Sequence, residues 1–193
     1  MNNRAPREWL QYQYREPGPL LIEMRRKQHT PERARLEYKV ASLRTRKQRP
    51  LLEARFAALF AYGMSTAIDH TVEFALHEAK DFDFVARYTV GNEMVYVPVQ
   101  LKEWVPLSVN PNQSLQDELD KLEKYTDSSD LVIVFCLNRT VSMDVSALRM
   151  PKQKFLEIWF LVCTSPNQEN WALIGNMLES SHQAYRFMYP NAA

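Results

Sequence analysis

Three polar residues, Asp83, Gln100 and Lys102, are the first candidates for chemistry, because an expected β-hairpin brings them together. Two alternating apolar segments flank the dipeptide Gly91-Asn92, which accepts the positive φ of a tight turn. A turn there pairs Asp83 with Gln100, with Cβ atoms about 4.5–5.5 Å apart, and places Lys102 one diagonal step away. Two oxygen ligands at that separation can hold a hard divalent cation such as Mg²⁺, and a lysine amine beside them can orient an attacking water. We therefore expect an enzyme with a hydrolytic metal site.

Alternation along the two strands gives the hairpin one apolar face and one polar face. The expected apolar face consists of three cross-strand pairs, extended by Phe82 and Leu101: Phe84 with Val99, Ala86 with Val97, and Tyr88 with Val95. On the polar face Asp81 lies beside Lys102. Asp81 either holds the lysine in a salt bridge or, if the register slips by two residues, replaces Asp83 as the ligand.

This arrangement, an Asp on one strand and Gln-Leu-Lys on the next, resembles the PD-(D/E)XK nuclease superfamily, the fold of many restriction enzymes and junction resolvases. The resemblance covers residues 51–137. It implies a Mg²⁺- or Mn²⁺-dependent nuclease that hydrolyses phosphodiester bonds, with DNA as the expected substrate. It also implies that Asp83 and Gln100 bind the metal, that the backbone carbonyl of Leu101 completes the ligand set, and that Lys102 assists the attacking water. Gln replaces the commoner Glu, and a neutral ligand is expected to weaken metal binding.

The Glu/Gln-x-Lys tripeptide is short, and the chain contains it three times. Glu37-Tyr38-Lys39 falls in an expected helix, where residues i and i+2 point in different directions. Glu78-Ala79-Lys80 has Asp69 upstream and remains a weaker competitor. Only Gln100-Leu101-Lys102 combines an apolar strand, a hairpin and an opposed carboxylate. If none of the three is catalytic, the alternative is a nuclease-fold subunit that has lost its chemistry and serves nucleic-acid binding or assembly.

Two further acidic residues are candidates for the same site. Glu53 falls near the start of an expected helix over residues 51–62, which Gly63 closes. The resembled superfamily commonly places a helix glutamate just before the sheet, where it reaches the metal directly or through water. The alternative is a first-turn glutamate that favours the positive end of the helix. Glu73, on an expected strand over residues 68–77, could border the site.

Charge is unevenly distributed along the chain, although the net charge is only +1. Residues 1–50 contain 13 Lys and Arg against 5 Glu, whereas the remainder contains 11 against 18 Asp and Glu. A basic segment of this kind faces phosphates, or it binds the acidic remainder of its own chain or of a second subunit. The expected partner is therefore nucleic acid, with a homodimer or a larger complex as the alternative.

An expected helix over residues 30–48 begins with Thr30-Pro31 as N-cap and first helical residue, and Pro50 ends or kinks it. One side of this helix gathers the best candidates for contact with a nucleic-acid backbone, namely Arg35, Lys39, Arg46 and Arg49. Upstream, Trp9, Tyr12 and Tyr14 lie among arginines. These aromatic side chains either stack on bases or pack on the domain or a partner.

Composition indicates one globular domain, because 46% of the 193 residues are hydrophobic. We expect a basic N-terminal extension over residues 1–50 and a nuclease-like domain over residues 51–193. No apolar run approaches the ~18 residues of a membrane span, and the N-terminus lacks the apolar stretch of a signal peptide. Cys136 and Cys163 fall in strand-like runs and are expected to be reduced thiols of a cytoplasmic protein.

The expected order of elements is a helix, a three-strand meander, a helix and a strand. Ser114 starts the second helix, and residues 131–137 form a buried strand that a right-handed crossover makes parallel to its neighbour. Residues 157–164 add another strand, and residues 171–178 form either a helix or a strand. The fold class is therefore α/β (α+β). The resemblance implies a restriction-endonuclease-like mixed central sheet flanked by helices, with a basic helical N-terminal extension.

Overall fold

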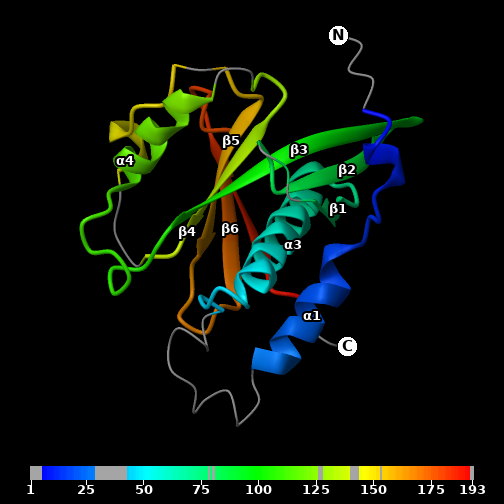
Figure 1. Ribbon diagram of the computed structural model, residues 1–193, viewed down its shortest axis with the longest axis horizontal. Helices are drawn as coiled ribbons and strands as arrows, with labels where there is room; N and C mark the ends of the chain where they lie inside the picture. The colour runs from blue at the N-terminus through cyan, green and yellow to red at the C-terminus, as the bar shows by residue number, and fades with distance from the viewer. Residues whose placement is uncertain are drawn as a thin grey trace.

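A mixed β-sheet forms the centre of the computed structural model, which describes residues 6–28, 43–77, 79, 81–125, 128–139, 144–152 and 154–191 (Figure 1). Within these residues, seven strands follow one another across the sheet in sequence order. The strands are β1 (Glu73–Leu76), β2 (Phe84–Val90), β3 (Glu93–Trp104), β4 (Val132–Leu137), β5 (Glu157–Cys163), β6 (Asn170–Gly175) and β7 (Gln183–Met188). The described α-helices are α1 (Pro17–Gln28), α3 (Arg49–Ile68) and α4 (Leu115–Asp120).

Strand directions divide the sheet into three parts. β1, β2 and β3 form an antiparallel meander, β4 and β5 run parallel to β3, and β6 and β7 return antiparallel. The succession of α3, meander, α4 and β4 agrees with the predicted order, and the parallel pairing of β4 with its neighbour is confirmed. Residues 171–178, which were predicted to be either a helix or a strand, contain most of strand β6. Strand β7 was not predicted. The molecule therefore has a mixed α+β fold.

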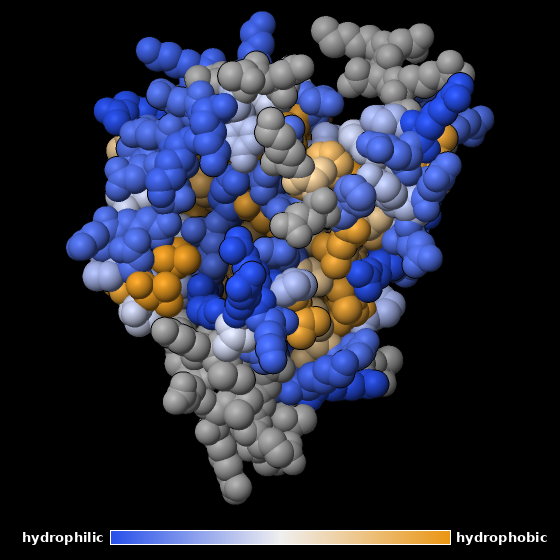
Figure 2. Space-filling view, in the orientation of Figure 1, coloured by the Kyte–Doolittle hydropathy of each residue, from blue (hydrophilic) through white to orange (hydrophobic). Residues whose placement is uncertain are grey.

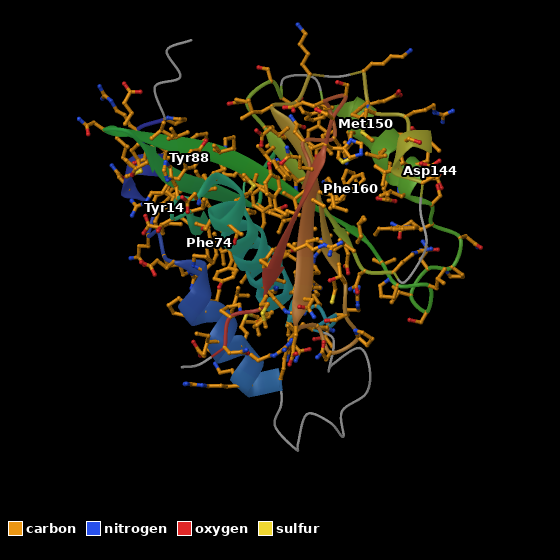
Figure 3. All side chains as sticks on the ribbon, turned by 180° about the vertical axis from the view of Figure 1, so that it is seen from behind. Tyr14, Phe74, Tyr88, Asp144, Met150 and Phe160 are labelled. Atoms are coloured by element: carbon orange, nitrogen blue, oxygen red, sulfur yellow. The ribbon has the colours of Figure 1, made fainter. Side chains whose placement is uncertain are left out.

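Hydrophobic residues pack on both faces of the sheet. α1 and α3 cover one face, where Leu59, Phe84 and Leu161 are fully buried. α4 covers the other face, where Phe135 and Phe160 are fully buried, and Phe160 lies in the middle of the sheet (Figure 3). Every residue of β4 is buried, as expected of a continuously apolar strand covered on both sides.

The β2–β3 hairpin has the predicted register. Gly91 has a φ of 59° in the turn, and the three expected apolar pairs form: Phe84 with Val99, Ala86 with Val97, and Tyr88 with Val95. Phe82 is the exception to the predicted apolar face, because it packs against the cluster under α4. The physical reason is that β2 begins only at Phe84, so the alternation of side chains does not extend back to Phe82.

Helix α3 is longer than predicted. It begins at Arg49, has Pro50 in its first turn and ends at Ile68, where Asp69 takes a left-handed φ of 54°. The prediction that the helix stops at Gly63 is wrong. Gly63 lies inside α3 because the sheet approaches the helix closely there: a Cβ at this position would be 2.6 Å from Phe187 Cε1. The predicted first strand is correspondingly shorter, since β1 covers only Glu73–Leu76.

Replacing Gly63 with Ala is expected to destabilise the protein by about 0.5–2 kcal/mol, because overpacking costs about 1–3 kcal/mol and Ala regains only ~0.5–1 kcal/mol of helix propensity. The added methyl would also lie 2.7 Å from Cδ1 of the fully buried Leu173. Urea denaturation measures the change. Gly18→Ala in α1 is the matched control, since its Cβ would meet only Tyr62 Cε2 at 3.9 Å, and its stability should be unchanged or slightly higher. Equal stabilities of Gly63→Ala and wild type would contradict the close approach.

The predicted helix over residues 30–48 is wrong at its C-terminal end. Residues 43–48 form turns, and Leu43 has a left-handed φ of 61°. Pro50 belongs to the start of α3 instead of ending a preceding helix. The remainder of that prediction, residues 30–42, lies outside the described residues.

The N-terminal aromatic residues pack on the domain, as one of the two sequence interpretations held. Trp9 meets the ring of Phe82 edge-on at 5.9 Å. Tyr12 stacks on His77 at 4.5 Å. Tyr14 contacts the hairpin through Tyr96, with centroids 5.8 Å apart. Each of these three rings therefore contacts an aromatic side chain of the domain.

Candidate functional site

Strand β3 changes its pairing partner near Val99. β2 pairs with residues 93–99 on one side, and β4 pairs with residues 99–104 on the other. Asp83, the residue just before β2, extends the hydrogen bonding between β2 and β3. Its backbone N–H donates to the carbonyl of Val99 at 2.9 Å, and its Oδ2 accepts from the backbone N–H of Leu101 at 2.6 Å. The carboxylate thus takes the place of a strand carbonyl and is fixed beside the Gln-Leu-Lys segment.

Gln100 is the centre of this arrangement. It is only 8% exposed, and its Nε2 donates both to Asp83 Oδ2 and, at 3.3 Å, to the carbonyl of Leu101. Its Oε1 accepts from the Tyr125 hydroxyl at 3.4 Å. Asp83 Oδ2 and the Leu101 carbonyl, which were both predicted to bind a metal, therefore accept hydrogen bonds from the same amide nitrogen. A bound cation would take over the role of these N–H donors.

Lys102 lies beside this group on the α4 side. Its Nζ is 5.5 Å from the centroid of the Tyr125 ring. Burial lowers the pKa of the Lys102 amine, and the negative charges of Asp83 and Glu118 act in the opposite direction. A lysine in this environment releases its proton more readily than a lysine in water, which is the property that a catalytic amine needs.

Asp81 is separate from the group. It is exposed and precedes the first residue of β2, and no ion pair between Asp81 and Lys102 occurs in the described part of the chain. The expected salt bridge is therefore wrong. The register also does not slip, because Phe84 pairs with Val99 and this pairing keeps Asp83 beside Gln100.

A pocket of about 450 Å³ brings Glu53 into the same neighbourhood. Glu53 faces it from the first turns of α3, and its carboxylate accepts from Arg49 Nε at 2.9 Å. Figure 2 shows the face that carries α3, with hydrophilic residues in its middle between two hydrophobic groups. The pocket is lined by Leu43, Arg44, Arg49, Leu52, Glu53, Phe56, Asp83, Gln100, Leu101, Lys102, Glu103 and Val105. The structure therefore gathers all four predicted site side chains and Leu101 at one pocket.

Arg44 and Glu103 belong to the pocket wall, and the sequence interpretation did not include them. Arg44 Nη1 donates to Glu103 Oε2 at 3.1 Å, and Nη2 donates to Oε1. Both side chains are mostly covered, with 10% and 20% of their surfaces exposed. Glu103 follows the Gln-Leu-Lys segment directly, but strand alternation turns it to the α3 face. No local pattern could connect it to Arg44, 59 residues earlier.

Glu73 does not border the site, so that prediction is wrong. Its carboxylate accepts from Arg87 Nε at 2.6 Å, and the same guanidinium lies 4.2 Å above the Tyr14 ring. The reason is the register of β1, which pairs Glu73 with Arg87 well along the hairpin and leaves Leu76 beside Phe84.

The predicted basic contacts are only partly described. Arg46 and Arg49 are exposed, and Arg49 is the first residue of α3. Arg35 and Lys39 lie outside the described residues. The same holds for Glu37-Tyr38-Lys39 and for two of the three residues of Glu78-Ala79-Lys80.

The donor set at the pocket is poor in carboxylates. Among the described residues, no group of three or more His, Cys, Asp and Glu side chains is placed to hold a metal ion. What converges instead is the carboxylate of Asp83, the amide of Gln100 and the carbonyl of Leu101. Two neutral oxygens and one carboxylate suit Mg²⁺, which prefers oxygen and keeps several waters, but they give a weak site.

Comparison with known proteins assigns no family. The chain matches no protein-family model, no curated protein and no solved structure. Within the described residues, no helix combines the length and apolar character required to cross a membrane.

Proposed function

We propose that this chain is a divalent-metal-dependent nuclease of the PD-(D/E)XK type that hydrolyses phosphodiester bonds, with DNA as the expected substrate. One observation carries the proposal. Asp83 Oδ2 and the Leu101 carbonyl both accept from Gln100 Nε2, just past the last β2–β3 pair and beside Lys102, whose pKa is lowered by burial. The order α3, β1–β3, α4, β4 supports the restriction-endonuclease-like core that the resemblance implies.

The residues at the pocket divide the work of hydrolysis between them. Mg²⁺ or Mn²⁺ held by Asp83, Gln100 and Leu101 would polarise the phosphate and make a water more acidic. The backbone N–H of Leu101 aligns the Asp83 carboxylate for that purpose. The amine of Lys102 takes up or returns a proton at Nζ and stabilises the negative charge that develops on the phosphate.

Basic residues at the pocket favour a phosphate-bearing substrate. Arg49 lines the pocket and is largely exposed, and Arg46 is exposed in the turn before α3. The net charge of +8 on residues 1–50 supports binding to a polyanion. The salt bridge from Arg44 offsets the charge of Glu103, so that this carboxylate repels phosphate less.

The direct test is incubation of the purified chain with plasmid, single-stranded DNA and RNA in the presence of Mg²⁺, Mn²⁺ or EDTA. We expect cleavage of at least the DNA substrates with a divalent cation and none with EDTA. If no substrate is cut with either cation, the proposal is wrong. Comparison of the substrates also shows whether the chain prefers DNA or RNA. Cleavage of the circular plasmid indicates endonuclease action, because an exonuclease needs a free end.

The second candidate is a nuclease-fold subunit without catalysis that binds nucleic acid or assembles with a partner. The hydrogen bonding of Gln100 favours it, because Nε2 and Oε1 are both satisfied without a metal. Calorimetry with Mn²⁺ distinguishes the two functions. If the chain is a non-catalytic subunit, Mn²⁺ binding that depends on Asp83 should be absent.

Replacing Glu53 with Gln should lower cleavage or raise the metal concentration that cleavage requires, while the fold holds. The expected loss of stability is small, since an exposed i,i+4 pair such as Arg49–Glu53 is worth about 0.3–0.5 kcal/mol. Cleavage rates across a Mg²⁺ titration, together with thermal unfolding, measure both effects. Arg49→Gln breaks the same ion pair and leaves the carboxylate, so it is the control. A fall in stability with unchanged metal dependence would assign Glu53 to the helix alone.

A further inference from the structure

We propose that Tyr125 is a positioning residue for this site: its hydroxyl holds the Gln100 amide in either of two orientations, and only one orientation admits a cation. The inference rests on the proposed function, and it adds a residue that neither the tripeptide nor the resemblance includes.

The contacts of Tyr125 place it against both polar side chains of the Gln-Leu-Lys segment. Its hydroxyl is 3.4 Å from Gln100 Oε1, and its ring faces Lys102 Nζ. The ring is held edge-on against Phe155, with centroids 5.9 Å apart. Tyr125 directly follows the 3₁₀ turn Lys121–Lys124, which continues α4, so it approaches β3 from the α4 face.

The Tyr125 side chain is a phenol, which carries its proton at neutral pH. A protonated phenol can donate one hydrogen bond and can also accept. Tyr125 can therefore satisfy either end of the Gln100 amide.

The orientation present in the structure closes the cation position. Gln100 Nε2 donates to Asp83 Oδ2 and to the Leu101 carbonyl, so an amide nitrogen occupies the point on which these oxygens converge. Rotating the amide by half a turn exchanges Oε1 and Nε2 with little change of shape. Oε1 then stands where Nε2 stood, against Asp83 Oδ2 and the Leu101 carbonyl, and these three adjoining oxygens repel one another unless a divalent cation binds beside them.

Tyr125 matters more in the second orientation than in the first. With the amide as it stands, loss of the hydroxyl removes one long hydrogen bond to Oε1. With the amide reversed, the hydroxyl is the acceptor for Nε2, and a Gln100 that is only 8% exposed has little access to water in its place. A buried donor without an acceptor is costly. Removing the hydroxyl should therefore disfavour the cation-admitting orientation selectively.

The test is Mn²⁺ affinity by calorimetry on the full chain, for wild type, Tyr125→Phe, Gln100→Glu and the double variant. Phe keeps the ring against Lys102 and Phe155. We expect Tyr125→Phe to weaken Mn²⁺ binding about tenfold in the wild-type background. In the Gln100→Glu background the loss should shrink to about twofold or less, because a carboxylate presents an oxygen in both orientations. That non-additivity is a readout that a merely structural role would not produce.

Side-chain amide NMR supplies a second readout. Mg²⁺ should shift the Gln100 Nε2–H signals of the wild type, and Tyr125→Phe should require more Mg²⁺ for the same shift. If Tyr125→Phe binds Mn²⁺ as wild type does, or loses equally in both backgrounds, the inference is wrong while the metal site stands. If wild type neither binds Mn²⁺ nor shifts with Mg²⁺, the proposed function and the inference fail together.

Discussion

Replacing Asp83 with Asn is expected to abolish divalent-dependent cleavage, with a loss of about a thousandfold or more, and to leave the fold and nucleic-acid binding in place. Asn keeps an oxygen that can accept from the Leu101 N–H and from Gln100 Nε2, so the join between β2 and β3 survives. What it removes is the only carboxylate in the converging donor set. Nucleic-acid binding should be unchanged or tighter, since a carboxylate without its cation repels phosphate.

Asp81→Asn is the matched control, because Asp81 is also acidic and nearby in sequence but exposed and outside the pocket lining. It should retain most of the activity. Cleavage rates, Mn²⁺ calorimetry and binding by fluorescence anisotropy are measured on the same preparations. Loss of activity in Asp81→Asn with full activity in Asp83→Asn would assign the ligand to Asp81. Unaltered Mn²⁺ binding in Asp83→Asn would leave the polar face of the hairpin as an ordinary surface.

Replacing Lys102 with Met is expected to lower turnover by about 10²–10⁴-fold while the protein still binds its cation. Met preserves much of the aliphatic stem, but it lacks the amine that lies over the Tyr125 ring and that would move a proton or offset charge on the phosphate. Because Lys102 is not among the oxygen ligands, Mn²⁺ affinity should be equal to or higher than that of wild type. Lys124→Met is the control, since Lys124 also faces the Tyr125 ring, at 5.6 Å, yet is exposed and outside the pocket lining.

The same variant tests the charge state of Lys102 through the pH dependence of stability. Burial lowers the pKa of Lys102 in the folded protein below the usual 10.5, although Asp83 and Glu118 oppose the shift. The unfolded chain therefore binds the proton more tightly, so this group makes wild-type stability rise with pH between the lowered value and 10.5. Lys102→Met should lack that rise, and its stability relative to wild type should be highest near neutral pH. Urea denaturation across pH 7–10 measures the difference, and parallel curves for the two proteins would refute the desolvated amine.

Local sequence was sufficient for the hairpin and for the pairing at its open end. Gly91 and Asn92 accept the turn, and the alternation on both sides fixes which residues of the paired strands face the core, so Asp83 beside Gln100 follows from short-range geometry. The same local logic accounts for Ser114, whose side chain caps α4 together with Asp117. The continuously apolar segment that became β4 was recognisable because a strand buried on both faces needs no polar side.

Tertiary structure alone decided where these elements end and what surrounds the site. Gly63 looked like a helix end because glycine favours helix termini, but the close approach of Phe187 and Leu173 requires a residue without a Cβ inside α3. Arg44 meets Glu103, and Tyr125 meets Gln100, across separations of 59 and 25 residues that no hydrophobic period can report. Phe82 changed faces, and the Asp83 carboxylate accepts from the Leu101 N–H of β3, because β2 begins only at Phe84 and the residues before it leave the strand alternation. Periodicity determines which side of an element is buried, but the packing of distant elements determines which polar groups meet there.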